Sequence, residues 1–321
     1  MDVAALLGVP ALAGDMDRVE SALSAATTSM DPFLSEVAGH LVRAGGKRIR
    51  PMLTLAAALA GGAEVTDDVI QGGISVELVH IGSLYHDDVM DEADSRRGVQ
   101  SVNARWGNLT AILAGDFLLA KASEIAASLG VEVAGLLAAT IGRLCEGQVG
   151  ELRTAFDVRR TEAAYLDSIS GKTASLTASA CRIGGIVSGL PRAQIDALTD
   201  FGEAFGMVFQ IRDDCLDVTA TDEDLGKPAG QDLVEGTYSL PVLRALAHPE
   251  VGDELRPLLG RPLDPLEMDK ARAVVRASGG VESALGEARR YADRAAAALV
   301  PLGEHPVARA LADAGHTLLD A

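Results

Sequence analysis

The chain has 321 residues, a formal net charge of −18 and 48% hydrophobic residues, while aromatic residues make up only 3%. This acidic balance argues against nucleic-acid binding, which needs basic side chains to displace counterions from phosphates, and against adsorption to anionic lipid. The three cysteines, Cys145, Cys181 and Cys215, are far apart and lack metal-ligand spacing, so we expect buried thiols in a reducing cytosol.

The beginning of the chain does not resemble a secretion signal. It carries an acid at position 2 and no basic segment ahead of its short apolar run. No apolar segment reaches the roughly 18 uncharged residues that a bilayer-spanning helix needs. We therefore expect a cytoplasmic protein with no membrane anchor.

Apolar residues recur every three or four positions along most of the chain, and strict alternation is nearly absent, which predicts an all-α fold. Capping residues and first-turn prolines mark several starts, among them Asp31-Pro32, Thr66 and Thr161. No linker rich in Ser, Gly or Pro divides the chain, so we expect one helical-bundle domain over residues 1–321. The predicted helices cover residues 16–29, 32–44, 51–60, 67–92, 108–128, 131–156, 162–188, 191–219, 239–247, 265–277, 280–299 and 305–319.

The pattern DDxxD occurs twice, as DDVMD at 87–91 and DDCLD at 213–217, each time at the end of a predicted apolar helix. The first and last Asp of each copy stand at i and i+4, so their carboxylates project from one helical face about 6 Å apart along the axis. At that separation and an effective dielectric near 20, the repulsion is on the order of 3 kcal/mol. The negative end of the helix dipole adds to it. The pair of motifs therefore predicts a bound cation.

Mg²⁺ is the ion that these residues favour. Carboxylate oxygens are hard ligands, and no His or Cys stands at metal-ligand spacing. Mg²⁺ takes one or two carboxylates and completes its shell with water and phosphate oxygens. One DDxxD alone could be a solvated helix end, but two copies, each beside basic residues, favour metal binding.

Basic residues form tight groups in this otherwise acidic chain. Arg offers a bidentate fork to phosphate oxygens and Lys offers a point charge. Each group alone could be a surface ion pair, but together they predict two diphosphate sites, one held through metal and one through basic side chains. The groups are GGKRIRP at 45–51, Arg96-Arg97, Lys172-Thr173, Arg212 and Gly226-Lys227.

The segments GGKRIRP, HDDVMDEADSRRG, GKTASL, FQIRDDCLD and GKPAGQDLVEG, in this order, resemble the motif series of the trans-isoprenyl diphosphate synthases, the polyprenyl synthetase family. The resemblance covers nearly the whole chain. It implies an all-α bundle of the isoprenoid synthase type, with a deep central cavity and the two DDxxD motifs facing each other across its mouth. It also implies a homodimer. The aliphatic faces near 108–156 would suit its interface, but core packing explains them equally well.

The resemblance implies three Mg²⁺ ions between the two motifs and the diphosphate of an allylic primer. Asp87, Asp91 and Asp213 would be ligands, and Asp88 and Asp217 would bind the ions or their waters. Arg96, Lys172 and Lys227 would contact the allylic diphosphate. The predicted catalytic set is Asp87, Asp88, Asp91, Asp213, Asp214, Asp217, Lys172 and Arg96.

The second substrate implied is isopentenyl diphosphate, bound by Lys47, Arg50, His80 and Arg97. A lone His on an apolar helix is more often a core residue, but His80 precedes Asp87 by two turns on about the same face. Thr173 and Gln210 join the substrate-binding set, although such groups more often make local hydrogen bonds. Gln148 and Glu151 are expected to face the same cavity. One departure is Thr237, where many members of the family carry Lys.

The reaction implied is a head-to-tail, all-trans condensation without a protein nucleophile. The product chain would descend along the helix before Asp87, past the small residues Val79, Gly82 and Ser83. Because no aromatic residue blocks these positions, we expect a long product, about C30 to C50. A short-chain farnesyl or geranylgeranyl diphosphate synthase is the alternative. A non-catalytic subunit and a terpene cyclase fit less well, since both aspartate motifs are present and aromatic residues are few.

Overall fold

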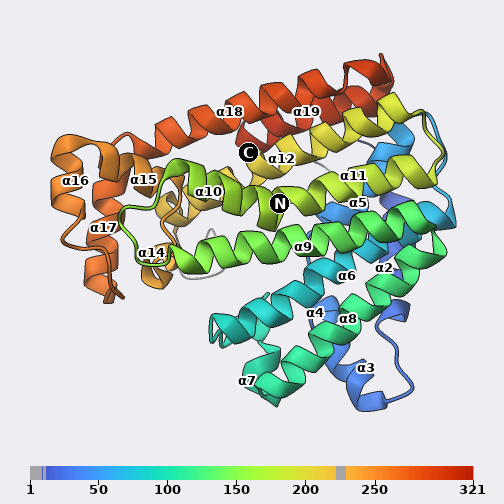
Figure 1. Ribbon diagram of the computed structural model, residues 1–321, viewed down its shortest axis with the longest axis horizontal. Helices are drawn as coiled ribbons and strands as arrows, with labels where there is room; N and C mark the ends of the chain where they lie inside the picture. The colour runs from blue at the N-terminus through green and yellow to red at the C-terminus, as the bar shows by residue number, and fades with distance from the viewer. Residues whose placement is uncertain (1–8, 10–11, 222–228, 321) are drawn as a thin grey trace. The chain divides into compact units, whose positions relative to one another are not determined.

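The computed structural model describes residue 9 and residues 12–221 and 229–320 (Figure 1). Within these residues the chain is helical apart from one short antiparallel hairpin, which confirms the all-α prediction. The first half contains α2 (Leu12–Ala26), α3 (Pro32–Ala38), α4 (His40–Arg43), α5 (Ile49–Ala60), α6 (Asp67–Met90), β1 (Ser95–Arg96), β2 (Val99–Gln100), α7 (Val102–Trp106), α8 (Asn108–Ser128) and α9 (Val131–Arg153). The second half contains α10 (Glu162–Ile169), the π-helix η1 (Ser170–Ala174), α11 (Ser175–Val187), α12 (Arg192–Thr219), α14 (Gln231–Glu235), α15 (Leu240–Ala247), α16 (Pro249–Leu255), α17 (Pro265–Ala277), α18 (Gly280–Ala298), the 3₁₀ turn η2 (Val300–Leu302) and α19 (Pro306–Asp320).

The predicted start signals act as N-caps. The Asp31 carboxylate accepts from the backbone N–H groups of Phe33 and Leu34. Thr66 and Thr161 each accept, through their hydroxyl, from the backbone N–H three residues on. These bonds satisfy donors that the first turn of a helix leaves open, which is why the predicted starts agree with the observed ones.

Two predicted helices are interrupted. The helix expected at 32–44 breaks at Gly39, where the carbonyl groups of Val37 and Ala38 accept from the buried Tyr85 hydroxyl at 2.8 and 3.1 Å. The helix expected at 162–188 contains the π-helix η1. The short helices α7, α14 and α16 and the hairpin were not predicted, because segments this short carry too little periodicity.

The chain packs into two compact units. Their boundaries fall inside helices and not in linkers, and a single domain over 1–321 stays a prediction. The first unit comprises Met1–Ile141, Leu176–Gly202 and Ala296–Ala314, and the second comprises Gly142–Ser175, Glu203–Ala295 and Gly315–Ala321.

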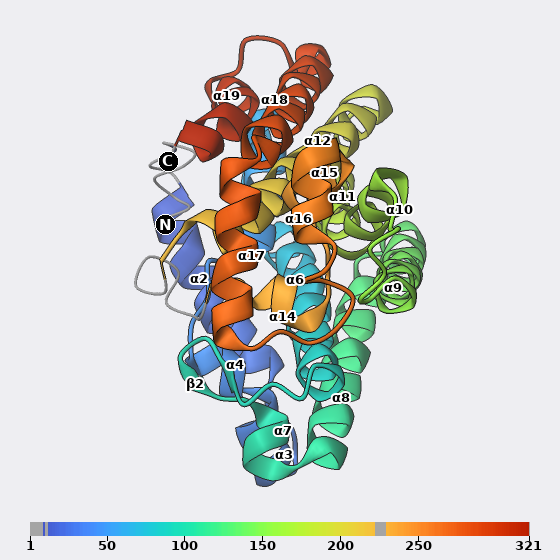
Figure 2. The same ribbon diagram turned by 90° about the vertical axis from the view of Figure 1, so that its left-hand side faces the viewer.

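In the first unit, α6 packs along α8 and α5 (Figures 1 and 2). Glycines allow these helices to approach closely. A Cβ on Gly82 would lie 3.1 Å from the Gly115 carbonyl oxygen of α8, and one on Gly73 would lie 2.9 Å from the Pro51 Cα at the start of α5. The C-terminal half of α6 is therefore held against α8, and its N-terminal half against the first turn of α5.

The second unit has its own apolar core. Tyr165, Ile211, Cys215 and Tyr238 are almost fully buried in it. The prediction of buried thiols is confirmed for Cys181 and Cys215 and is wrong for Cys145, which is exposed. Helices α15, α16 and α17 pack against one another around this core (Figure 1). The core holds the end of α12, which carries the second aspartate motif. Among the described residues, no helix has both the length and the apolar character needed to cross a bilayer.

Candidate active site

The first aspartate motif closes α6. Asp87 is 8% exposed, Asp88 is fully buried and Asp91 is exposed. Asp91 caps the helix, with its backbone N–H donating to the Asp87 carbonyl at 2.8 Å. Asp87 and Asp91 thus stand one turn apart, as the spacing predicts.

Asp88 is held by Arg96. The Nε and Nη2 atoms of Arg96 each lie 2.7 Å from Oδ1 of Asp88. Burial raises the pKa of the Asp88 carboxyl, and the Arg96 charge opposes this rise. The other oxygen, Oδ2, is buried with no hydrogen-bond partner among the described residues. Arg96, which the family resemblance assigns to the allylic diphosphate, here pairs with an aspartate of the first motif.

The hairpin β1–β2 aims the two arginines in different directions. Its turn residues Arg97 and Gly98 have φ angles of 55° and 75°, the left-handed backbone that a tight hairpin requires. Arg97 donates from Nη1 to the Leu41 carbonyl at 2.9 Å and to the Gly45 carbonyl at 2.5 Å. Arg96 therefore reaches α6 while Arg97 reaches the GGKRIRP loop. The RRG sequence is the signal that could have indicated this turn.

Arg50, Arg97 and His80 lie in one electrostatic cluster within the first unit. Burial and then the charges of Arg50, Arg97, Arg96 and Arg48 lower the pKa of His80 well below its usual value. Burial also lowers the pKa of Arg50, with Arg97 adding to the effect and Glu77 opposing it. The imidazole is neutral at pH 7. Lys47 is exposed on the adjoining loop.

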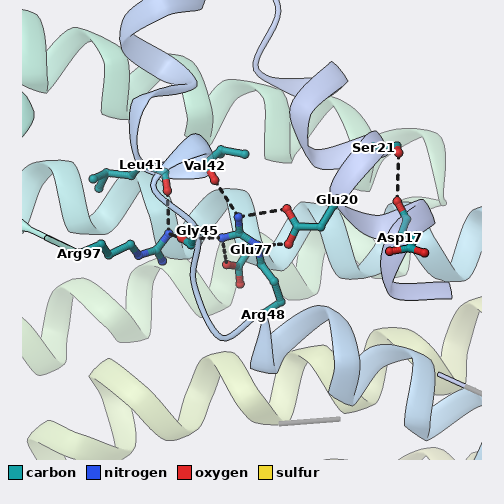
Figure 3. Close-up of polar contacts among 9 residues, drawn as sticks. All are labelled: Asp17, Glu20, Ser21, Leu41, Val42, Gly45, Arg48, Glu77 and Arg97. Atoms are coloured by element: carbon teal, nitrogen blue, oxygen red, sulfur yellow. Dashed lines mark hydrogen bonds and ion pairs between the residues drawn. The ribbon is translucent and has the colours of Figure 1, made fainter. Parts of the chain in front are cut away.

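The sequence reasoning missed a buried network at Arg48 (Figure 3). Arg48 is 3% exposed and has a φ of 48°. Its Nε and Nη2 donate to the two Glu20 carboxylate oxygens at 2.6 and 3.2 Å, and Nη1 lies 3.4 Å from Oε1 of Glu77. It also donates to the carbonyl groups of Val42 and Gly45. Arg48 thus fixes the loop at 44–48, between α4 and α5, instead of facing solvent.

In the second unit, the middle aspartate of DDCLD is held by two neutral donors. The Tyr165 hydroxyl donates to Oδ2 of Asp214 at 2.5 Å, and the Gln210 amide donates to Oδ1 at 2.7 Å. Burial raises the pKa of Asp214 to about 7, while these two hydrogen bonds oppose the rise. Asp213, its neighbour, is half-buried. The Asp214 carboxyl therefore anchors the end of α12 in the core, a role for Tyr165 that the sequence did not indicate.

The π-helix η1 carries Lys172 and Thr173. Such turns are frequent at functional sites because they displace side chains from helical register. Lys172 donates from Nζ to Oε1 of Glu151 at 2.8 Å, and the Thr173 hydroxyl donates to Oε1 of Gln210 at 2.7 Å. The structure thus brings together two pairs of predicted residues. Gln148, on the same helix as Glu151, is 7% exposed.

The last aspartate of DDCLD orders the chain that follows. Asp217 is 2% exposed, and its Oδ2 accepts from the Asp232 backbone N–H at 3.2 Å. The backbone N–H of Thr237 donates to the Asp232 carbonyl at 2.8 Å. Lys227 lies outside the described residues.

The three residues predicted to line the product path differ in surroundings. Gly82 faces α8 at the close crossing described above, so packing already explains the missing side chain. Val79 is fully buried. The hydroxyl of Ser83, which is partly buried, donates to the His80 carbonyl at 2.9 Å.

The residues at the end of α6 suit a hard divalent cation. Among the described residues, no group of three or more His, Cys, Asp or Glu side chains is arranged so that it could hold a metal ion. The donors are carboxylates only, and Asp88 Oδ2 is a buried oxygen with no protein donor among those residues. A Mg²⁺ ion, which needs few protein ligands beside water and phosphate, fits this set.

The sequence model of the polyprenyl synthetase family matches residues 31–276. The chain belongs to this family. Among curated members, it is 40% identical to the nonaprenyl diphosphate synthase of Mycobacterium tuberculosis, over 92% of this chain and 89% of that one. It is 39% identical to heptaprenyl diphosphate synthase component 2 of Geobacillus stearothermophilus, over 88% of each chain. This polyprenyl synthetase is therefore an enzyme that transfers prenyl groups, a polyprenyl diphosphate synthase.

Solved structures of polyprenyl synthetases share its fold. A polyprenyl synthase from Caulobacter crescentus, complexed with calcium and isoprenyl diphosphate, aligns with a TM-score of 0.92 at 33% identity, covering 99% of this chain and 98% of that one. A geranylgeranyl pyrophosphate synthase from Corynebacterium glutamicum aligns with a TM-score of 0.85 at 40% identity, covering 98% of both. These alignments confirm the predicted isoprenoid synthase fold.

The low pKa of His80 predicts a pH dependence of stability. The unfolded chain binds a proton at this residue below about pH 6.5, and the folded chain does not, so the free energy of unfolding falls as the pH drops through that value. Between pH 7.5 and 5.5, we expect the free energy of unfolding to decrease by about 1 kcal/mol less in His80→Gln than in the wild type. Urea unfolding at the two pH values measures this free energy. The control is His316→Gln, because the His316 side chain is exposed and lies beside Asp293. Parallel curves for His80→Gln and the wild type would contradict the prediction.

Proposed function

We propose that this enzyme condenses isopentenyl diphosphate with an allylic diphosphate, head to tail and in trans, with Mg²⁺. The observation that carries the proposal is the cluster of Arg50, Arg97 and neutral His80, two turns from an acidic helix end. A cationic cluster beside a group of carboxylates suits one diphosphate bound by protein charges and one bound through metal.

The residues have distinct parts in the reaction. Lys47, Arg50 and Arg97 bind the diphosphate of isopentenyl diphosphate, and His80 donates a hydrogen bond to it as a neutral imidazole. The aspartates of the DDxxD motifs would hold Mg²⁺, which would supply positive charge to the departing allylic diphosphate.

The chemistry needs no protein nucleophile. The allylic C–O bond breaks and its electron pair leaves with the diphosphate, giving an allylic cation. The double bond of isopentenyl diphosphate forms the new C–C bond, and a proton passes to the released diphosphate. Lys172 and Lys227 add fixed charge where negative charge develops.

The purified chain alone, given farnesyl diphosphate, isopentenyl diphosphate and Mg²⁺, should release diphosphate and form elongated prenyl diphosphates. We expect Asp87→Asn and Asp213→Asn to lower kcat by about 10²- to 10³-fold, because each removes charge that holds the metal at the leaving group. The control is Glu64→Gln, which removes an exposed acid and should retain the wild-type kcat.

Continued elongation in EDTA, or wild-type kcat in both variants, would refute the proposal. Cyclised hydrocarbon as the product would indicate a terpene cyclase. Activity only after addition of a second protein would indicate a subunit of a heteromeric synthase.

We also propose a long product, about C30 to C50. Relatives named for nonaprenyl and heptaprenyl products support this, while the Corynebacterium glutamicum relative is named for the shorter geranylgeranyl product. Because packing against α8 explains Gly82, the proposal depends on Ser83 as the small residue one turn before Asp87.

Ser83→Phe should shift the products toward C15–C20, because the ring would occupy the path of the growing chain. Chromatography of the dephosphorylated products measures the distribution. Ser83→Ala is the control and should retain the wild-type length. An unchanged distribution in Ser83→Phe would show that this position does not face the chain.

We propose a homodimer that uses α8. Leu109, Ile112 and Leu113 are 73%, 42% and 57% exposed and form one apolar stripe at i, i+3 and i+4. Leu113→Glu should convert a dimer to a monomer in light scattering, whereas Ser128→Glu, at the far end of α8, should not. A dimer that persists in Leu113→Glu would contradict this interface.

A further inference from the structure

One buried acid lies among the basic groups of the first unit. Glu77, in the middle of α6, is 1% exposed. Its Oε1 lies 3.4 Å from Nη1 of Arg48, and its Oε2 is buried with no hydrogen-bond partner among the described residues. A buried carboxylate with one bare oxygen is costly, so its charge must be balanced by its surroundings.

The packing of α6 directs Glu77 toward the basic loop. Gly73 contacts Pro51 at the start of α5, and Glu77 follows Gly73 by one turn on the same face. Burial lowers the pKa of Arg50 and of Arg97, and the negative charge of Glu77 opposes this fall. At Arg48 burial also acts to lower the pKa, but the hydrogen bond to Glu20 and the Glu77 charge outweigh it, so the pKa is raised. The negative charge of Glu77 thus offsets part of the positive charge of all three arginines.

Arg48 already has a partner of its own. The Glu20 carboxylate accepts two hydrogen bonds from it, as Figure 3 shows. Arg97 donates to carbonyl oxygens, and Nε of Arg50 is buried with no hydrogen-bond partner among the described residues. Glu77 therefore shares the charge of Arg48 with Glu20, and it is the acid whose charge most offsets those of Arg50 and Arg97.

Arg97 and Arg48 meet at the same glycine. A Cβ on Gly46 would lie 2.9 Å from atoms of both guanidinium groups, and the Gly45 carbonyl accepts from both side chains. Two cations so close repel each other unless an anion lies nearby. Glu77 is a buried anion beside them, and a diphosphate would be a second one.

We infer that Glu77 is an internal counter-ion of the isopentenyl diphosphate site: it holds the arginine cluster together while the site is empty and opposes the incoming diphosphate, thereby weakening its binding. The inference rests on the proposed assignment of Arg50 and Arg97 to that substrate. Glu77 is a positioning residue, since it would act through the arginines and not on the reacting atoms.

The test is the affinity of Glu77→Gln for isopentenyl diphosphate, measured by calorimetry in EDTA, where the metal-dependent site cannot bind a diphosphate. A unit charge roughly 7 Å away changes a binding constant by up to about fifty-fold at an effective dielectric near 20, and solvent screening reduces this. We expect the Kd to fall about tenfold. Glu77→Asp, which keeps the charge, should return the Kd toward the wild-type value.

A second readout separates this role from a merely structural one. Without ligand, Glu77→Gln should melt at a lower temperature than the wild type, because the arginines repel. Isopentenyl diphosphate should then raise the Tm of Glu77→Gln by more than it raises that of the wild type. A purely structural residue would lower the Tm and leave the ligand-induced shift unchanged or smaller.

The controls distinguish this inference from the proposed function. Glu64→Gln, which removes an exposed acid of the same unit, should bind with the wild-type Kd. Loss of binding in Arg50→Ala, together with a wild-type or weaker affinity in Glu77→Gln, would overturn the role of Glu77 alone. Wild-type affinity in Arg50→Ala and Arg97→Ala would overturn the substrate site itself, and the inference with it.

Glu20→Gln keeps the question open to experiment if Glu77→Gln does not fold. Glu20 is 48% exposed, and its loss removes negative charge from the same network. We expect a smaller tightening, about threefold. Wild-type or weaker affinity in this variant would then count against the inference.

Discussion

The site depends on burying opposite charges together. A lone ion in the interior costs several kcal/mol, so most of the buried charges near the motifs have a partner. Arg48 lies between Glu20 and Glu77, Arg96 pairs with Asp88, and Lys172 pairs with Glu151. Asp214 instead uses a hydroxyl and an amide, and its pKa rises accordingly. Each partner fixes the direction of a side chain that solvent would leave mobile.

These pairs can form because the helices that carry them approach closely. A Cβ on Gly147 would lie 2.7 Å from the Lys172 backbone nitrogen, and one on Gly171 would lie 2.7 Å from the Arg143 carbonyl oxygen. This contact holds α9 against the π-helix η1, so that Lys172 of η1 reaches Glu151 of α9 and forms an ion pair with it. Gly73 and Gly82 act in the same way for α6, toward α5 and α8. Glycine positions therefore determine which charged side chains meet.

Periodicity and capping residues predicted the helices well, because both are local. DDxxD spacing placed Asp87 and Asp91 one turn apart for the same reason. The partners of the motif residues were not predictable. Glu20 and Glu77 are 28 and 29 residues from Arg48 in sequence, and Tyr165 is 49 residues from Asp214. Such contacts depend on tertiary packing, which a single sequence does not encode in any local pattern.

One rigid helix sets the spacing between the two kinds of charge in the first unit. His80 and Asp87 are separated by seven residues of α6, which corresponds to about 10 Å of rise. The negative end of the helix dipole lies at the aspartates, where it favours cations. Glu77 lies one turn before His80, and its negative charge offsets part of the positive charge of Arg50 and Arg97. Because the backbone hydrogen bonds of an α-helix set its rise per residue, the distance along α6 between the aspartates and the basic cluster is set by the helix itself. In the proposed reaction, binding at the two places would orient two diphosphates relative to one helix, which would lower the entropy cost of bringing their carbon chains together.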